Sequence, residues 1–454
     1  MQLICILPGL ISLYFVLLGR ADKAFLNVYL PCLLLLPQYY YYRIPHLTAL
    51  STSDFALIPI AIYCVMHLRG ARQIRRMDFW VLLFITSFAV SEITREHFPK
   101  DGISLWLALC VVEMLMSYVV GRVLIEPSLR LVTIKRSVIM LLCHFPFGVY
   151  EFVRGKNLWI NIGYRMFQFA GGWEHDRGGY TRIGTCLGGP IHAGMTFMFA
   201  MAFSFYLAYL YKTDRASLGT WTAIIEKYRL PFLLFPMLIV MTVSRMPMAC
   251  TVLVVLLMQI PRFKKIRTGV IVIGLIVVVG TSAVYYRFEK YTSVAPSAAK
   301  DEAQGSAIYR KQMLENYAPV VEAGGWFGWG SLSFPNVGGQ SSIDNAYLLA
   351  ELGQGKIGLY LFLIIAAESL VSLSIYAVIF KVRQNRVLVF CFLASLVSLF
   401  VCLYTVYLGA LMPQLLFLLL GWSQSLQDVP ASGAQPATVQ VGAEPKFHFR
   451  RVIA

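Results

Sequence analysis

IGLYLFLIIAAESLVSLSIYAVIF (Ile357–Phe380) decides the fold class, because it holds a single charged residue, Glu368, in a run longer than the roughly 20 residues that a membrane-spanning helix needs. Similar apolar runs recur along the chain. They fall at 2–19, 24–41, 53–68, 79–93, 103–121, 137–153, 187–211, 230–244, 247–260, 269–286, 387–405 and 407–421. We therefore expect residues 1–421 to form a single all-α domain, a polytopic membrane bundle of about 12–13 transmembrane helices.

The composition argues against other classes of protein. Hydrophobic residues make up 58% of the chain and charged residues 14%, whereas a soluble chain carries roughly a quarter charged residues. The formal net charge of +16 could suggest nucleic-acid binding, but Arg and Lys gather in short connectors and not on one helical face or in one tail. We therefore expect no nucleic-acid partner. The nine cysteines are scattered without a CxxC pair, which predicts small core residues and not a metal cage or a disulfide frame.

Positive charge alternates along the chain. Every second connector is strongly basic, and cytoplasmic loops of membrane proteins are enriched in Lys and Arg. The basic connectors contain Arg69–Arg76, Arg122–Arg136, Lys212–Arg229, Arg262–Arg267 and Lys381–Arg386. This pattern assigns them to the cytoplasm. It places four connectors outside, namely Arg95–Gly102, Arg154–Cys186, the turn at Arg245, and Tyr286–Asn345.

Two outer loops and a C-terminal tail complete the predicted organisation. The first outer loop spans 154–186, and the second, 286–345, is the longest polar segment. Within it, Ser306–Tyr317 predicts a short helix with Ser306 as its N-cap and Pro319 limiting its extent. Residues 422–454 have no periodicity and predict a disordered cytoplasmic tail.

Several arginines mark a candidate site on the outer face. Arg245 lies between two apolar runs, where ionisable groups are costly and usually functional, although a snorkelling interfacial arginine is the alternative. Arg177 and Arg182 precede a Gly-Gly-Pro segment, and guanidinium groups suit phosphate oxygens. Their alternative role is pairing with a loop carboxylate. Arg310, near the start of the loop helix, suits an anion site, or it is an ordinary solvated arginine.

Asp344 and Asn345 lie where the long outer loop returns to the membrane. Asp344 either caps the following helix or acts as a base that orients an acceptor, and these readings stay open. The helix dipole and nearby arginines would make it a weak base. His192 also lies toward the outer face. No Asp, Glu or His partners stand at metal-ligand spacing, so we expect no metal site and no cofactor.

Short motifs follow one another in a fixed order on this face. They are R-x-G-x5-P-I (Arg182 to Ile191), SR (Ser244-Arg245), YR (Tyr309-Arg310), P-x8-GWG (Pro319 to Gly330), DN-x-YL (Asp344–Leu348) and ELG (Glu351–Gly353). Each is weak alone, but their order and common side resemble the O-antigen ligase and O-antigen polymerase superfamily. The resemblance covers roughly residues 180–375.

The resemblance implies a helical bundle similar to class C glycosyltransferases, with a large late periplasmic loop. It also implies a glycan donor on undecaprenyl diphosphate, used at the periplasmic face of the bacterial inner membrane. Arg245 and Arg310 match the family's arginines, which are thought to hold the diphosphate. In ligases the residue before the motif asparagine is a histidine proposed as the base. Here that place holds Asp344, which favours a polymerase of O-antigen or exopolysaccharide type.

We therefore expect a metal-independent glycosyltransferase that joins glycan repeat units to an acceptor sugar hydroxyl. Its partners would be the lipid-linked donor and acceptor, membrane lipids, and the chain-length regulator and flippase of the same pathway. The expected catalytic residues are Asp344, Arg310 and Arg245, and the expected substrate-binding residues are Arg182, Arg177, Asn345, Tyr347 and His192.

Three alternatives remain open. The first is a ligase that transfers the glycan to lipid A–core. The second is a transporter or flippase of a lipid-linked or anionic solute, against which stand the missing inverted repeat and the large outer loop. The third is a membrane scaffold without catalysis, which leaves Arg245 unexplained.

Overall fold

The computed structural model describes residues 2–44, 49–67, 74–94, 107–167, 176–294, 300–331, 334–338, 340, 342–380 and 382–427. The predicted outer connector at 95–102 and the part of the predicted tail from 428 onward lie outside these residues. Helices dominate the described chain, and its strands form two short antiparallel hairpins. The expectation of an all-α polytopic membrane protein is confirmed.

The first half of the chain consists of short helical pieces and two strand pairs. Its elements are η1 Gln2–Ile6, α1 Leu7–Leu17, α2 Ala21–Ala24, η2 Phe25–Tyr29, α3 Leu30–Leu35, β1 Tyr41–Arg43, β2 Ala49–Ser51, α4 Thr52–His67, α5 Arg76–Thr94, η4 Leu107–Met116, α7 Ser117–Val123, α8 Pro127–Leu142, α9 His144–Arg154, α10 Leu158–Phe167, β3 Asp176–Arg177 and β4 Tyr180–Thr181. The apolar run predicted at 24–41 is helical only as far as Leu35, and the reason is local. Leu36 is extended, as expected of a residue that precedes a proline, here Pro37.

The second half contains the longer helices. They are α11 Pro190–Thr213, η5 Arg215–Leu218, α12 Thr220–Lys227, α13 Leu230–Met241, α14 Arg245–Leu257, η6 Ile260–Arg262, α15 Ile266–Thr292, α16 Glu302–Gly324, α17 Ala346–Ile379, α18 Arg383–Leu403 and α19 Met412–Leu426. In the described chain, 7 helices are long and apolar enough to cross a membrane. Three shorter apolar helices, Gln2–Leu17, Thr52–His67 and Leu230–Met241, accompany them.

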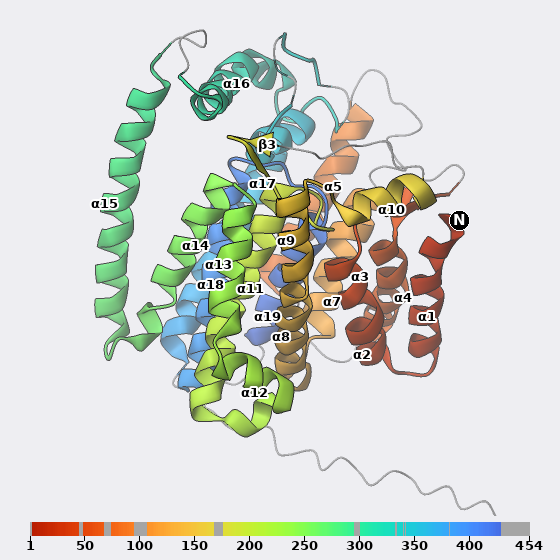
Figure 1. Cartoon of the computed structure of the whole chain (residues 1–454). Coiled ribbons are helices and arrows are strands. Elements are labelled where there is room, and N and C mark those ends of the chain that lie inside the picture. The colour runs from red at the N-terminus through yellow and green to blue at the C-terminus, as the bar shows by residue number, and fades with distance from the viewer. Residues whose placement is uncertain are drawn as a thin grey trace, which may run out of the picture.

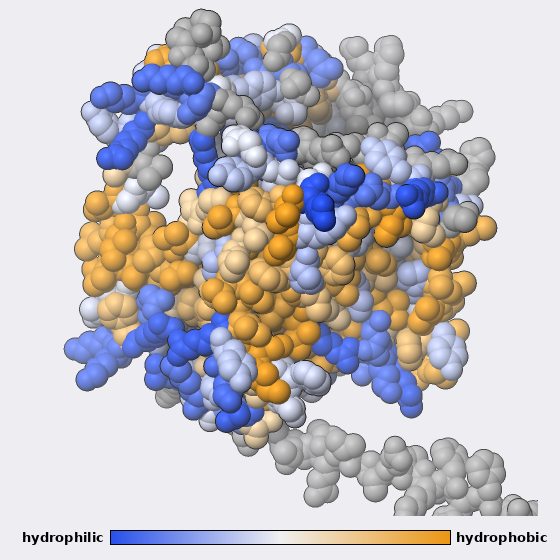
Figure 2. Space-filling view, in the orientation of Figure 1, coloured by the Kyte–Doolittle hydropathy of each residue, from blue (hydrophilic) through white to orange (hydrophobic). Residues whose placement is uncertain are grey.

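On the face shown in Figure 2, an apolar band lies between two polar rims. In Figure 1, α12 lies at the lower end of the bundle, whereas α16 lies across the upper end, beside β3. The basic connector Lys212–Arg229, which contains α12, is therefore on the opposite face from the long outer loop. This arrangement is the one that the alternation of charge requires.

The centre of the bundle is built on α11, α18 and α19. In the most apolar 18-residue stretch of α11, 83% of the residues are buried, and the same share is 78% in α18. In α15 only 12% of such a stretch is buried. Trp422 of α19 stacks on Phe203 of α11 at 5.7 Å between ring centroids and meets Phe392 of α18 edge-on at 4.9 Å. α15 stands at the left edge of the bundle in Figure 1, with most of its apolar side chains facing outward.

Two glycines let α7 and α19 pack backbone against backbone. A Cβ at Gly121 would lie 2.2 Å from the carbonyl oxygen of Leu418, and one at Gly421 would lie 2.0 Å from that of Tyr118. Small residues at such contacts are a common device in membranes, because lipid offers no hydrophobic drive for helices to associate.

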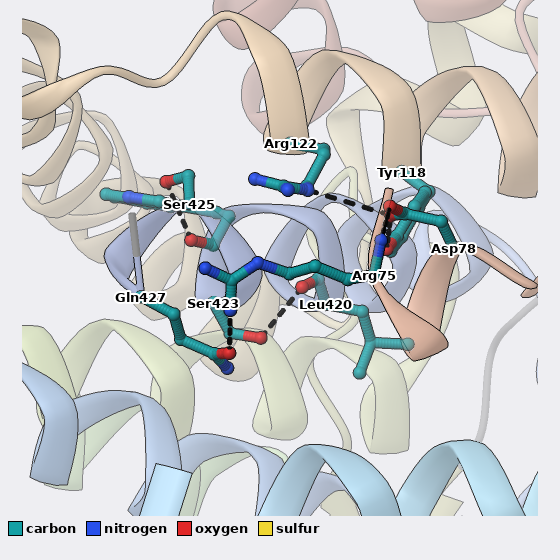
Figure 3. A network of polar contacts seen from close by, with 9 residues as sticks. Arg75, Asp78, Tyr118, Arg122, Leu420, Ser423, Ser425 and Gln427 are labelled. Atoms are coloured by element: carbon teal, nitrogen blue, oxygen red, sulfur yellow. Dashed lines mark hydrogen bonds and ion pairs between the residues drawn. The ribbon is translucent and has the colours of Figure 1, made fainter. Parts of the chain in front are cut away.

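A polar network holds the start of α5 to α7 and to the end of α19 (Figure 3). Arg122 Nε lies 3.6 Å from Asp78 Oδ1, and the Tyr118 hydroxyl donates to the same oxygen. Arg75 donates to Gln427 Oε1. The Arg122 side chain is only 5% exposed, and a guanidinium so deeply buried needs a partner. The arginines that mark the topology therefore also fasten helices together.

The GGWFGWG segment (324–330) docks into a break in α17. The break lies at Gly355, whose backbone is non-helical (φ 69°, ψ −166°). The backbone N–H of Trp329 donates to the Leu352 carbonyl at 2.8 Å, and a Cβ at Gly328 would come within 2.4 Å of the Gly355 nitrogen. Irregular backbone at membrane depth must find its partners within the protein. The GWG motif therefore supplies backbone partners and anchors the long outer loop on α17.

The close contact of α7 and α19 predicts an effect of a single methyl group. We expect Gly421→Ala to lower the melting temperature of the purified protein in detergent, because overpacking of a tight contact costs about 1–3 kcal/mol. Gly274→Ala in α15 is the matched control, since nothing lies within 4 Å of that position and both changes bring the same gain in helix propensity. An equal melting temperature for the two variants would contradict the contact.

Candidate active site

Six of the eight predicted site residues line one cavity of about 590 Å³ on the face that bears α16. They are Arg177, Arg182, Arg245, Arg310, Asp344 and Asn345. These residues come from segments more than 160 positions apart in the chain. The cavity lies between the β3–β4 hairpin, the start of α14, the upper part of α15, α16 and the start of α17.

Arg245 is the first residue of α14, and its side chain is exposed to the cavity. The turn that presents it is tight. Val243 adopts a left-handed conformation (φ 47°), and Ser244 is extended. Arg182 braces this turn, because its Nε donates to the Thr242 carbonyl at 3.1 Å and its Nη2 donates to Ser244 Oγ at 2.9 Å. Arg182 thus contributes charge to the cavity and also fixes the position of Arg245.

Arg177 reaches the cavity from the β3–β4 hairpin. It pairs with Tyr180 across the hairpin, and Asp176 pairs with Thr181. The Thr181 hydroxyl also donates to Asp176 Oδ1 at 2.9 Å. Asp176 is therefore occupied within the hairpin, and the half-buried Arg177 lines the cavity.

Arg310 lies on α16, which is longer than predicted. The helix begins at Glu302 and its N-cap is Asp301, whose side chain accepts from the Gln304 N–H, so the prediction of Ser306 as N-cap is wrong. Pro319 does not end the helix, which continues to Gly324. Packing compensates for the hydrogen bond that proline removes. Arg310 is therefore more than two turns inside the helix, and the argument from a helix N-terminus does not hold for it.

Packing explains the length of α16. Met313 and Tyr317 are buried against Leu348 and Leu352 of α17. Trp329 adds a hydrogen bond from its Nε1 to the Val320 carbonyl at 2.8 Å, just beyond the proline.

Asp344 faces Arg310 and does not cap α17. Its Oδ2 lies 3.8 Å from Arg310 Nη2, and the two side chains are 32% and 29% exposed. The N-cap is Asn345, whose Oδ1 accepts from the N–H groups of Tyr347 at 2.9 Å and Leu348 at 3.1 Å. The capping reading of Asp344 is therefore wrong, and its carboxylate stays available to the cavity.

The YR motif positions this pair. The Tyr309 hydroxyl donates to the Ser342 carbonyl at 2.8 Å and accepts from the Ser342 N–H at 3.0 Å. These two bonds hold the segment before Asp344 against α16, one residue from Arg310. In the YR motif, Tyr309 therefore positions the chain and Arg310 supplies the charge.

Positive charge dominates the cavity. Its lining includes five cationic side chains and two carboxylates, namely Arg177, Arg182, Arg245, Arg310, Lys311, Glu289 and Asp344. Burial lowers the pKa of the Arg310 guanidinium; Asp344 raises it, and Arg177 and Arg245 lower it further. An arginine remains charged at neutral pH, so the lowered pKa reports mainly the cost of burying the Arg310 charge and, to a smaller extent, repulsion by Arg177 and Arg245. A bound anion would relieve both.

Two predicted substrate contacts lie elsewhere. His192 is buried, with Nε2 3.3 Å from the Tyr407 carbonyl oxygen and its ring edge-on to the Tyr407 ring. Tyr347 donates from its hydroxyl to the Phe400 carbonyl at 2.8 Å. Neither residue lines the cavity.

The structure also adds an apolar wall that the motifs did not indicate. Tyr285 and Phe288 of α15 line the cavity, together with Met246 and Leu314. Lys311 could have been suspected as the neighbour of Arg310. Tyr285 and Phe288 could not have been suspected from the sequence, because they lie in a span whose composition is typical of an ordinary membrane helix. Within the described chain, no group of three or more His, Cys, Asp or Glu residues is placed to hold a metal ion.

The cavity predicts tight binding of a small diphosphate anion. We expect Arg310→Ala to weaken the binding of inorganic pyrophosphate about tenfold or more, because a hydrogen bond to a charged group contributes about 1.5–3 kcal/mol. Isothermal titration of the purified protein measures this. Arg287→Ala, an exposed α15 arginine outside the lining, is the control and should bind like the parent chain. Equal affinities for all three proteins would contradict an anion site here.

A comparison with family models bears on residues 230–363. This segment matches the O-Antigen ligase family model, whereas a comparison with curated proteins finds no match. The matched segment runs from α13 into α17 and contains Arg245, Arg310 and Asp344, while Arg177 and Arg182 precede it. The match agrees with the resemblance drawn from the motifs, because residues 230–363 are similar to the O-Antigen ligase family and hence to the O-antigen ligase and O-antigen polymerase superfamily.

Proposed function

We propose that this protein is an inner-membrane glycosyltransferase that polymerises glycan repeat units, taken from an undecaprenyl-diphosphate donor, onto an acceptor sugar hydroxyl at the periplasmic face. The observation that carries the proposal is the convergence of Arg177, Arg245 and Arg310 on one cavity that also contains Asp344. Its biological setting would be O-antigen or exopolysaccharide biosynthesis, together with the flippase and the chain-length regulator of the same pathway.

The chemistry needs charge neutralisation more than covalent catalysis. In the transfer, the bond from the anomeric carbon to the phosphate oxygen breaks and a bond from that carbon to the acceptor oxygen forms. The diphosphate leaves with the bonding electrons, and the acceptor hydroxyl loses its proton. Fixed guanidinium groups stabilise the negative charge that develops on the leaving diphosphate, without reorganisation during the reaction. On this proposal the arginine cluster supplies that charge without a metal.

Asp344 is the proposed partner of the acceptor. Its carboxylate orients the attacking hydroxyl and receives its proton, while Arg310 at 3.8 Å holds it in place. Asn345 contributes by capping α17, which fixes the backbone on which Asp344 stands.

The lipid part of the donor fits the apolar wall of the cavity. Tyr285, Phe288 and Met246 give that wall an apolar surface, and the background is visible between the upper part of α15 and the bundle in Figure 2. A prenyl chain could pass through such an opening from the bilayer, so that its diphosphate meets the arginines while the chain remains in lipid.

A ligase is the second candidate, because the matched family is described as O-Antigen ligase. The two reactions share the donor and the diphosphate site, and they differ in the acceptor. The carboxylate at Asp344, where ligases have a histidine, favours the polymerase. A transporter of the same lipid-linked substrate would use the arginines as a vestibule, and it would form no glycosidic bond.

The proposal predicts that the arginines are needed for chain extension. We expect Arg245→Ala and Arg310→Ala to abolish the ladder of longer glycans that the purified protein forms from its lipid-linked repeat unit, while both variants still insert into membranes. Arg287→Ala should form the ladder normally. Extension at the parent rate in both cavity variants would overturn the proposal. A transferred glycan without a ladder would favour the ligase, and translocation without a new bond would favour the transporter.

A second prediction separates the proposed role of Asp344 in proton transfer from its effect on the charge of the cavity. We expect Asp344→Asn to reduce extension by about 10²–10⁴-fold, the usual contribution of a positioned base. The same change should leave pyrophosphate affinity equal or higher, because it removes a negative charge from the cavity. A comparison of the turnover rate with the pyrophosphate dissociation constant tests this. A loss of both together would assign Asp344 to binding.

A further inference from the structure

A second cavity, of about 500 Å³, lies between the N-terminal helices and α17. Residues from the β1–β2 hairpin, α4, α5, η4 and α17 line it, together with the segment at the start of α19. No residue lines both cavities. The match to the O-antigen ligase family reaches this cavity only through α17 and the loop before it.

The second cavity lacks the positive charge of the first. Among the described residues that line it there is no lysine and no arginine, and its carboxyl groups are those of Asp54 and Glu113. A partly buried space without a cationic group disfavours a diphosphate, because buried charge needs a partner. The ligand of this cavity is therefore not the anionic part of a substrate.

Three polar groups in the cavity have hydrogen-bonding capacity to spare. Glu113 has no hydrogen-bond partner among the described residues, and it stands on η4, a π-helix, a geometry that is rare and frequent at functional sites. Gln38 Oε1 is buried and has no hydrogen-bond partner among the described residues. Gln354 accepts from Ser87 at 2.9 Å, and its side-chain amide N–H groups have no described partner. The cavity thus offers acceptors and donors, which suits hydroxyl groups, since each hydroxyl both donates and accepts.

The remaining polar lining is already fixed. Asp54 Oδ2 accepts from the Ser51 N–H and hydroxyl, both at 2.7 Å, and its Oδ1 accepts from Gln414 Nε2 at 2.5 Å. Both carboxyl oxygens of Asp54 therefore already accept hydrogen bonds within the wall, and Asp54 stabilises that wall.

Aromatic rings form much of the apolar lining. They are Tyr41, Phe84, Phe88, Phe334, Phe362 and Tyr407. Rigid apolar surfaces with a few placed polar groups are typical of small-molecule sites. Sugar rings match this pattern, because their C–H faces pack on aromatic rings and their hydroxyls point to the polar groups.

The two cavities share a wall. Asn345 lines the first and its neighbour Ala346 lines the second, so consecutive residues of one chain segment face the two spaces. The Ala346 N–H donates to the Val406 carbonyl at 3.1 Å, and the segment around Val406 likewise separates Thr405 in the first cavity from Tyr407 in the second. A glycan held in the second cavity would lie one chain segment away from the diphosphate site.

We propose that the second cavity binds an uncharged sugar unit of the acceptor glycan, with Glu113 and Gln38 accepting from its hydroxyls and Gln354 donating to one. This inference rests on the proposed glycosyl transfer. It assigns the two substrates to two spaces: the diphosphate of the donor to the arginine cavity, and the acceptor sugar to the acidic, aromatic one.

The test compares two probes on the same purified protein. The probes are a neutral oligosaccharide released from the surface polysaccharide of the host cell, and inorganic pyrophosphate. We expect Glu113→Leu and Ala350→Phe, which fills the cavity, to weaken oligosaccharide binding about tenfold or more, because the first leaves a sugar hydroxyl without its partner and the second removes the space itself. Both variants should bind pyrophosphate within about twofold of the parent chain, since that site keeps all its charges and so loses little free energy. Retained pyrophosphate binding shows that a variant is folded.

Glu368→Leu is the matched control, because Glu368 is a half-buried carboxylate on α17 outside the cavity, and both probes should bind it normally. Unchanged oligosaccharide affinity in both cavity variants would overturn the inference, and so would a parent chain that binds no oligosaccharide. The proposed function would survive either result if the parent chain still formed a ladder. If Arg310→Ala formed one as well, the proposed function itself would fail.

Discussion

Positive charge that is gathered and partly buried in one cavity is the constraint on which the site depends. Burial and the charges of Arg177 and Arg245 all disfavour the charged form of Arg310, and Asp344 offsets only part of this. Such a cluster would spread apart if its supports were loose, because like charges in a partly dry space interact more strongly than in water. The surrounding contacts resist that spreading. Arg182 braces the turn that presents Arg245, and the hairpin keeps its own carboxylate, Asp176, occupied.

α17 connects the site to the membrane bundle. Its first turn is capped by Asn345, directly after Asp344, and its break at Gly355 receives the GGWFGWG segment. The second half of the long outer loop is thus fastened to α17 at two places, and α16 packs on the same helix through its buried face. The motifs that looked alike in the sequence therefore divide into two kinds. The arginines and Asp344 face the cavity, whereas the GWG glycines and Tyr309 hold the backbone that presents them.

The class of fold could be predicted from the sequence, because the length of an apolar run is a local property. The shared position of the charged residues could be predicted from the order of the motifs and from the side of the membrane assigned to each. The sequence was insufficient where tertiary contacts decide the outcome. Pro319 predicted the end of a helix, but packing of Tyr317 on α17 carries α16 past it. His192 and Tyr347 looked available, yet each makes a contact with a backbone carbonyl in the bundle. The second cavity had no sequence signal, because its polar residues come from segments far apart in the chain and none stands in a motif.

A structure of the protein with undecaprenyl diphosphate bound, determined by electron cryomicroscopy in lipid nanodiscs, tests the central claim most directly. The account predicts density for the diphosphate between Arg177, Arg245 and Arg310, with the prenyl chain leaving along α15. Density for the diphosphate on the opposite face, among the basic connectors near α12, or in the acidic second cavity would contradict it.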